Sequence, residues 1–176
     1  MILLICGSLR AGSVNAAVLG TAATFTTTTT FTGLADLPHF NPDDDHDPLH
    51  PAVADMRARI AAADAVLFST PEYAGGLPGS FKNLLDWTIG GGEIYDKPVA
   101  WINASSGAAP TGGADAHDSL RKVLTYAGAR IVSEACVRIP IARAAVGDGL
   151  VTDPDLQGRI AMAVNDLRAG AVPPTE

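Results

Sequence analysis

Residues 2–15 read Ile-Leu-Leu-Ile-Cys-Gly-Ser-Leu-Arg-Ala-Gly-Ser-Val-Asn, an apolar run that passes through a small polar loop into a helix signal. Residues 2–6 are apolar at every position, whereas a half-exposed strand would alternate, so the run predicts a central strand covered on both faces. Ser13 is a preferred helix N-cap residue, and Val14 and Val18 follow at helical spacing. The stretch therefore predicts a strand, a turn and a helix in succession.

The alternation of strand and helix signals continues along the whole chain. Short apolar runs alternate with segments of helical periodicity, which is typical of a parallel sheet covered on both faces. The run Thr26–Thr30 is expected to form a half-exposed strand because threonine is β-branched. No long linker divides the chain, so we predict one α/β domain over residues 1–176. The other predicted strands are residues 65–70, 98–103 and about 130–139, and the predicted helices are 14–22, 53–60, 78–85, 114–127 and 154–167.

The composition excludes several classes of protein. A hydrophobic fraction of 47% and a charged fraction of 18% favour a compact fold over a disordered chain. The formal net charge is −7, and no basic stripe interrupts it. Because binding to a phosphate backbone requires clustered Lys and Arg, nucleic acid is not an expected partner.

The two cysteines and the apolar runs indicate the compartment. Cys6 and Cys136 are far apart in sequence and outside any CxxC pair, so we expect both to be small buried hydrophobes in a reducing compartment. The first apolar run is too short for a signal-peptide core, and no apolar stretch reaches the length of a membrane span. We predict a cytoplasmic protein that has no membrane partner.

Residues 38–48 form a polar segment with four acidic side chains and two imidazoles. This composition invites a metal-site interpretation. Three prolines and an unbroken charge run fit a solvated loop better, and we predict no metal site here.

Three loops follow predicted strands with unusual composition, and ligands of open parallel sheets bind beyond the carboxyl ends of the strands. The first loop offers hydroxyls at Ser8 and Ser13, the guanidinium of Arg10, the amide of Asn15 and free N–H groups at a helix start. This equipment suits a phosphate monoester. An ordinary small-residue turn with a helix cap is the alternative, but Arg10 has no capping role.

The second and third loops consist mainly of small residues. Residues 71–79 contain Pro71-Glu72-Tyr73 and two glycines, and residues 103–113 add hydroxyls and glycines at another strand end. Small side chains let a flat ring approach the backbone, whose polar groups can pair with a heterocycle. Alone, the second loop could equally be a turn into the next helix. Three such loops at alternate strand ends predict one ligand site.

No nucleophile or acid–base pair emerges from the sequence. Ser105-Ser106-Gly107 does not form a G-x-S-x-G elbow, and no triad order follows it. Glu72 could be a general base or could be held by nearby backbone N–H groups. His117 could touch a ligand, although an exposed helical histidine is the more common outcome. We predict no catalytic side chain.

At these residues the chain resembles the NADPH-dependent FMN reductase family of small flavodoxin-like quinone, chromate and azo-dye reductases. The resemblance covers residues 1 to about 130. It implies a doubly wound, five-stranded parallel sheet in the order 2-1-3-4-5 with helices on both faces. The motifs that carry it are Gly7-Ser8-Leu9-Arg10 with Ser13 and Asn15, then Pro71-Glu72-Tyr73, Leu77-Pro78-Gly79, Lys82-Asn83, Asp86-Trp87 and Lys97-Pro98.

The resemblance also implies a mechanism and a set of roles. NADPH or NADH would pass hydride to FMN, and FMN would pass it to a small acceptor such as a quinone, azo compound or free flavin. The first loop would bind the FMN phosphate, the second would line the ring, and the third would close the pyrimidine or ribityl side. The implied cofactor-binding residues are Ser8, Arg10, Ser13, Val14, Asn15, Pro71, Glu72, Tyr73, Ala74, Gly75, Ser105, Ser106 and Gly107.

Family members are commonly homodimers or homotetramers with the flavin near the interface. The resemblance therefore implies that Trp87 and the Gly90–Tyr95 loop contact a second subunit. The chain departs from the family pattern at Ala74, where Asn usually follows Pro-Glu-Tyr, and in a third loop rich in Ala, Pro and Thr. Two alternatives stay open: a flavodoxin-type electron carrier, and a flavin-binding regulatory module.

Overall fold

The structure is a computed structural model that describes residues 1–105 and 110–172. Its main sheet is parallel and places the first strand, β1 (Ile2–Cys6), in the interior. The strand order is β2-β1-β3-β4-β5, which confirms the predicted order. The remaining strands of this path are β2 (Thr28–Phe31), β3 (Ala65–Ser69), β4 (Pro98–Ser105) and β5 (Arg130–Ile131).

The predicted fifth strand is present but interrupted. Residues 130–139 form β5 and a second short strand, β6 (Val137–Pro140), and both pair with β4. A 3₁₀ turn at Ser133–Ala135 separates them and buries Ala135 completely. An edge strand can bend in this way because its outer side has no hydrogen-bond ladder to maintain.

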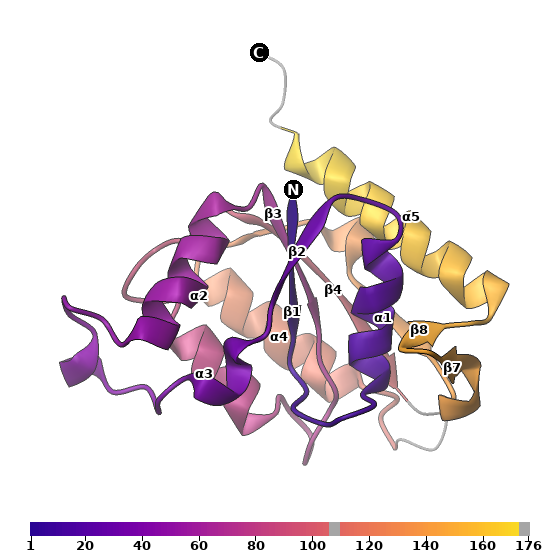
Figure 1. Ribbon diagram of the computed structural model, residues 1–176, viewed down its shortest axis with the longest axis horizontal. Coiled ribbons are helices and arrows are strands. Elements are labelled where there is room, and N and C mark those ends of the chain that lie inside the picture. The colour runs from indigo at the N-terminus through magenta and orange to yellow at the C-terminus, as the bar shows by residue number, and fades with distance from the viewer. Residues whose placement is uncertain (106–109, 173–176) are drawn as a thin grey trace.

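Helices cover both faces of the sheet (Figure 1). One hydrophobic cluster joins the sheet to α1 (Val14–Ala23) and α5 (Pro154–Ala171), and a second joins it to the three other helices. Successive side chains of a strand point to opposite faces, so Leu4 belongs to the first cluster and Leu3 to the second. The helices of the second face are α2 (Pro51–Ala62), α3 (Gly79–Asp86) and α4 (Ala114–Tyr126).

A short antiparallel hairpin, β7 (Val146–Gly147) and β8 (Leu150–Val151), lies beside α1 and α5 (Figure 1). This hairpin was not among the predicted elements. The buried Thr21 hydroxyl of α1 accepts a hydrogen bond from the Val151 backbone N–H at 2.9 Å, which fastens the hairpin to the helix.

The polar segment 38–48 is packed more tightly than the predicted solvated loop. The side chain of Asn83 accepts from Phe40 N and donates to Pro38 O. Further along, Asp45 pairs with the guanidinium of Arg57 at 2.8 Å, and the two side chains are 11% and 9% exposed. Most of the segment is exposed, as the predicted solvated loop requires, but α2 and α3 supply partners from distant parts of the chain to Pro38, Phe40 and Asp45.

Trp87 is also buried within the chain. Its side chain is 1% exposed, its Nε1 donates to Pro38 O at 2.9 Å, and its ring lies edge-on to Phe40. The implied contact of Trp87 with a second subunit is therefore wrong, since this ring is enclosed by its own segment 38–48.

The cysteines behave as weakly reactive core side chains. Cys6 and Cys136 are free thiols, partly buried against the hydrophobic clusters. Burial raises the pKa of the Cys6 thiol and raises that of Cys136 to about 11. Both therefore stay protonated near neutral pH. Among residues 1–105 and 110–172, no helix is long and apolar enough to cross a membrane.

Candidate active site

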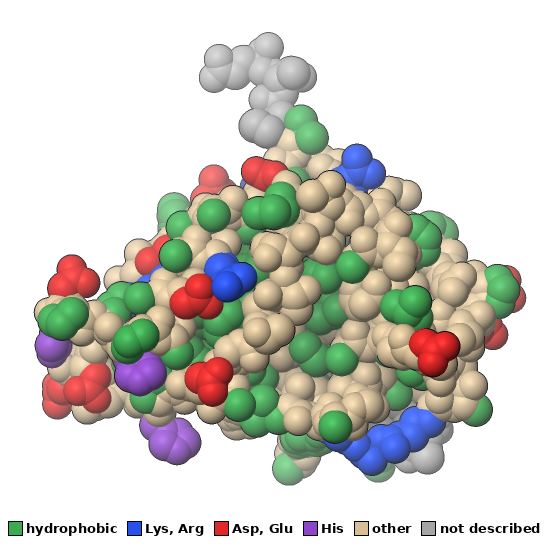
Figure 2. Space-filling view, in the orientation of Figure 1, with side chains coloured by type: hydrophobic (Ala, Val, Ile, Leu, Met, Phe, Trp, Pro, Cys, Tyr) green, Lys and Arg blue, Asp and Glu red, His purple; other side chains and the backbone are tan. Residues whose placement is uncertain are grey.

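A pocket of about 310 Å³ lies at the carboxyl ends of the central strands. It falls at the lower edge of Figure 1, and Figure 2 shows Lys and Arg side chains gathered at this edge beneath α1 and the hairpin. The volume is at the lower end of the range of small-molecule sites, about 300–1,000 Å³. Nine of the predicted residues line it: Ser8, Arg10, Ser13, Val14, Asn15, Pro71, Glu72, Tyr73 and Ser105.

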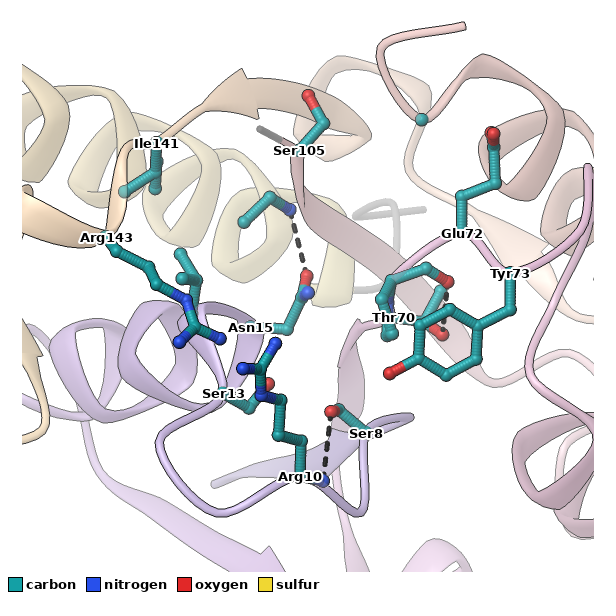
Figure 3. Close-up of a pocket in the computed structure, with 14 residues that line it drawn as sticks. Ser8, Arg10, Ser13, Asn15, Thr70, Glu72, Tyr73, Ser105, Ile141 and Arg143 are labelled. Atoms are coloured by element: carbon teal, nitrogen blue, oxygen red, sulfur yellow. Dashed lines mark hydrogen bonds between the residues drawn. The ribbon is translucent and has the colours of Figure 1, made fainter. Parts of the chain in front are cut away.

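The first loop presents its polar groups at one end of the pocket (Figure 3). Ser8 Oγ accepts from Arg10 N at 3.3 Å, and Ser13 Oγ caps α1 by accepting from Ala16 N at 3.4 Å. Both hydroxyls act as acceptors in these bonds, so their protons remain available for a ligand. A Cβ at Gly7 would lie 2.4 Å from Thr70 Oγ1, so this loop approaches the end of β3 as closely as glycine allows.

Asn15 lines the pocket and also contacts the ends of two strands. Its side chain is 4% exposed, and its Oδ1 accepts from Ala104 N at 2.9 Å and lies 2.9 Å from Ser69 Oγ. The Ser69 hydroxyl also lies within hydrogen-bonding distance of Ile102 O. The amide thus links α1 to the carboxyl ends of β3 and β4.

The second loop turns back on itself next to the pocket. Tyr73 and Gly76 exchange two backbone hydrogen bonds of 3.0 and 3.1 Å, and the intervening Ala74 and Gly75 have φ angles of +50° and +71°. Left-handed conformations at both central positions define a type I′ turn. Neither Ala74 nor Gly75 lines the pocket, in contrast to Pro71, Glu72 and Tyr73.

Glu72 holds the start of α4. The Thr111 hydroxyl and the backbone N–H groups of Asp115 and Ala116 donate to its carboxylate. The helix begins after Gly113, which has no side chain to cap it, so Glu72 satisfies N–H groups that would otherwise lack partners. The Thr111 hydroxyl first, and then the two N–H groups, hold the pKa of Glu72 below its usual range. Of the two predicted roles, the structure favours the carboxylate held by backbone N–H groups.

His117 is neither exposed nor part of the pocket, which corrects both predicted outcomes. Its Nδ1 accepts from Trp101 Nε1 at 2.8 Å, and the two rings meet edge-on. Burial, followed by the charges of Arg121 and Arg138, lowers the pKa of His117, which matches a neutral, accepting imidazole.

Five residues beyond the predicted set line the pocket; Ala104 and Gly113 belong to the predicted third loop, whereas Thr70, Ile141 and Arg143 lie outside the three predicted loops. Arg143 and Ile141 follow β6, the second part of the interrupted edge strand, and the loop after that strand was not considered. Ligands of parallel sheets bind beyond the carboxyl ends of the strands, so the position of Arg143 just after an edge strand could have marked it as a pocket residue. Two predicted residues, Ser106 and Gly107, lie outside the described residues. The five added lining residues are Thr70, Ala104, Gly113, Ile141 and Arg143.

A family model described as NADPH-dependent FMN reductase matches residues 1–144. The chain belongs to this family. Membership makes it an NAD(P)H-dependent flavin oxidoreductase with a flavodoxin-like fold, and it confirms FMN and a nicotinamide nucleotide as its cofactors. It also extends the resemblance beyond residue 130 to the segment that carries Arg143.

Individual relatives agree with this assignment. An NAD(P)H-dependent FMN reductase of Pseudomonas aeruginosa is 36% identical over 89% of this chain and 82% of its own length. A 2-hydroxy-1,4-benzoquinone reductase of Burkholderia is 38% identical over 71% of this chain and 70% of its own. Among solved structures, a flavoenzyme NAD(P)H:(acceptor) oxidoreductase of Paracoccus denitrificans has a TM-score of 0.81 and 31% identity, covering 96% of this chain and 97% of its own.

The left-handed turn at Ala74 leads to a testable prediction. A left-handed backbone costs a residue with a Cβ roughly 1–2 kcal/mol, whereas Gly adopts it freely and Asn is the better-tolerated alternative. We expect both Ala74→Gly and Ala74→Asn to raise the free energy of unfolding by about 1 kcal/mol. Chemical denaturation of the apoprotein measures this change.

The same pair of variants separates strain from ligand contact. The two variants should be equally stable. If the amide of Asn at position 74 also reaches the flavin, Ala74→Asn binds FMN more tightly than Ala74→Gly. If both variants are less stable than the parent protein, the strain attributed to this turn is absent.

Proposed function

We propose that the protein oxidises NADPH or NADH and passes the hydride through FMN to a small acceptor such as a quinone, azo compound or free flavin. The observation that carries this proposal is the pocket, which combines a cationic, hydroxyl-rich end with a wall of small residues and backbone. The reductase relatives support this function over the electron carrier and the regulatory module.

The residues present fit FMN at the phosphate end. Arg10 supplies a full charge, Ser8 and Ser13 supply hydroxyl donors, and the N-terminal end of α1 adds its partial positive charge. These groups lie on one side of the pocket in Figure 3. We propose that they bind the FMN phosphate, with Val14 and Asn15 shaping the floor beneath it.

The opposite side fits a flat ring. Tyr73 is 52% exposed and stands at the pocket edge (Figure 3), and Pro71 and Ser105 also line the pocket. We propose that residues 71–75 and the loop at 105–107 hold the isoalloxazine. Bound FMN supplies the hydride chemistry, and the chain orients it and leaves one ring face open. Glu72 keeps its carboxylate engaged with α4 and the third loop and therefore serves as a positioning residue.

An anaerobic absorbance spectrum tests the function. The purified protein is titrated with FMN, separated from free flavin and mixed with NADPH, and a quinone is then added. We expect the band of protein-bound flavin to bleach with NADPH and to recover with the quinone. Bound flavin that NADPH and NADH both leave oxidised would contradict the proposal and favour the carrier or the regulatory module.

Removal of the Arg10 guanidinium gives a prediction for the phosphate end. We expect Arg10→Ala to weaken FMN binding by about 1.5–3 kcal/mol, the scale of a hydrogen bond to a charged group. Flavin fluorescence quenching measures the dissociation constant. Arg168→Ala removes one positive charge from α5 outside the pocket and serves as the control. Equal affinity in Arg10→Ala and the parent protein would remove Arg10 from the site.

The same proposal includes the domain organisation, the compartment and the oligomeric state. We propose that residues 1–176 form one FMN-binding domain, that the protein works in the cytoplasm, and that it assembles as a homodimer or homotetramer.

Exposed Ile89 and Tyr126 line a groove between α3 and α4, and exposed Tyr95 lies in the loop expected at the interface. We expect Tyr126→Glu to reduce the mass measured by light scattering, and an unchanged mass would exclude this groove from the interface.

A further inference from the structure

Two guanidinium groups converge on the phosphate end of the pocket. Arg10 comes from the loop after β1 and Arg143 from the 3₁₀ turn Arg143–Ala145 that follows β6. Their side chains point toward one another next to Ser13 in Figure 3. In a chain with a net charge of −7, this pair stands out against the prevailing charge.

Neither guanidinium has a carboxylate partner among the ion pairs of residues 1–105 and 110–172. Glu72, the acidic residue that lines the same pocket, is bound to Thr111 and the start of α4. Like charges brought together repel, and the repulsion is relieved when an anion lies between them. The pair is therefore suited to hold an anion.

Arg143 reaches this position because the segment around it is fastened at both ends. Ile141 N donates to Ser105 O at 3.0 Å, which ties the segment to the end of β4. Beyond the turn, Thr152 N donates to Ala145 O at 2.9 Å, and the β7–β8 hairpin is bound to Thr21 of α1. The hairpin thus holds Arg143 near the N-terminal end of α1, where Ser13 caps the helix.

We propose that Arg143 supplies the second positive charge for a phosphate monoester bound at this end of the pocket. A phosphate monoester carries about 1.5–2 negative charges at pH 7, so Arg10 alone leaves much of that charge unpaired. Two ligands of the proposed function carry such a group, FMN at its 5′ position and NADPH at its 2′ position. The inference therefore rests on that function and adds a residue that determines specificity for the phosphate.

The test compares Arg143→Gln with the parent protein and with Arg168→Gln. Arg168 lies on α5 near the amino ends of the strands, so its substitution changes the net charge equally and leaves the pocket intact. Dissociation constants for FMN and riboflavin are measured by fluorescence quenching, and KM values for NADPH and NADH are measured with FMN saturating. Thermal melting confirms that each variant is folded.

We expect Arg143→Gln to weaken FMN binding about tenfold while riboflavin binding stays the same, because riboflavin has no phosphate. Arg143→Lys keeps the charge but lacks the planar guanidinium, so its dissociation constant for FMN should lie between those of the parent protein and Arg143→Gln. If the bound group is the 2′-phosphate of NADPH, the FMN to riboflavin ratio is preserved and the KM for NADPH rises relative to NADH.

The inference is overturned if both ratios in Arg143→Gln equal those of the parent protein, or if Arg168→Gln changes them as much. Failure of the proposed function gives a different result. In that case the parent protein itself either binds FMN no better than riboflavin or leaves the bound flavin oxidised in the presence of NADPH and NADH.

Discussion

Arg57→Ala is expected to lower the free energy of unfolding by about 3–5 kcal/mol, as removal of one partner of a buried ion pair typically does. Arg57 is 7% exposed, and its guanidinium makes two hydrogen bonds of 2.9 and 2.7 Å to Trp87 O and one of 2.8 Å to Asp45. Alanine would leave the Asp45 carboxylate and the Trp87 carbonyl without these donors. Urea denaturation monitored by tryptophan fluorescence measures the loss.

Arg59→Ala provides a matched control on the same helix. Arg59 also pairs with an aspartate, Asp55, at 2.8 Å, but these two side chains are 41% and 51% exposed. Exposed pairs one helical turn apart contribute about 0.3–0.5 kcal/mol, so Arg59→Ala should change stability by less than about 1 kcal/mol. Equal losses of stability in Arg57→Ala and Arg59→Ala would show that burial of Arg57 and its hydrogen bonds adds nothing to the free energy of unfolding.

Asn15→Ala is expected to lower the free energy of unfolding by about 2–3 kcal/mol. The substitution removes the acceptor of the Ala104 N–H, which is buried between α1 and the end of β4. Ser69 can still donate to Ile102 O, so one donor rather than two is left without a partner. Denaturant unfolding of the apoprotein measures the effect without a contribution from flavin binding.

Two variants complete the Asn15 test. Asn165→Ala changes an exposed asparagine on α5 and should shift stability by at most about 0.5 kcal/mol. Asn15→Asp keeps an acceptor oxygen facing Ala104 and should be more stable than Asn15→Ala, while its added negative charge weakens FMN binding. An Asn15→Ala protein as stable as the parent would contradict the linking role of this amide.

The helices and central strands could be predicted because their signals are local. The run Ile2–Cys6 is apolar at every position, and the structure covers both faces of β1. The Ser13 cap begins α1 where expected, and α4 ends within one residue of the predicted boundary. The edge of the sheet was harder to predict, because residues 130–139 contain enough apolar residues for one continuous strand and do not reveal the break. The break at Ser133–Ala135 depends on how Ala135 packs in the first hydrophobic cluster.

The candidate site shows the same division. The first loop carries an arginine, two hydroxyls and a helix start within eight residues, so its chemistry was visible before the fold was known. Arg143 lies in the short segment Ile141-Ala142-Arg143-Ala144-Ala145, which contains no phosphate-binding pattern. Its place in the pocket depends on β6, on the hairpin and on the Thr21 hydroxyl.

The sequence by itself determined the α/β alternation, the first loop with its arginine and two hydroxyls, and the small-residue loop at residues 71–79. Periodicity, capping and turn chemistry act over a few residues, so one stretch of chain is enough to specify them. Tertiary structure alone decided that Glu72 caps α4, that Asp45 pairs with the buried Arg57 and that Arg143 lies beside Arg10 in the pocket. These side chains acquire their roles from partners many residues away, which become neighbours only when the strand ends and the surrounding loops pack together.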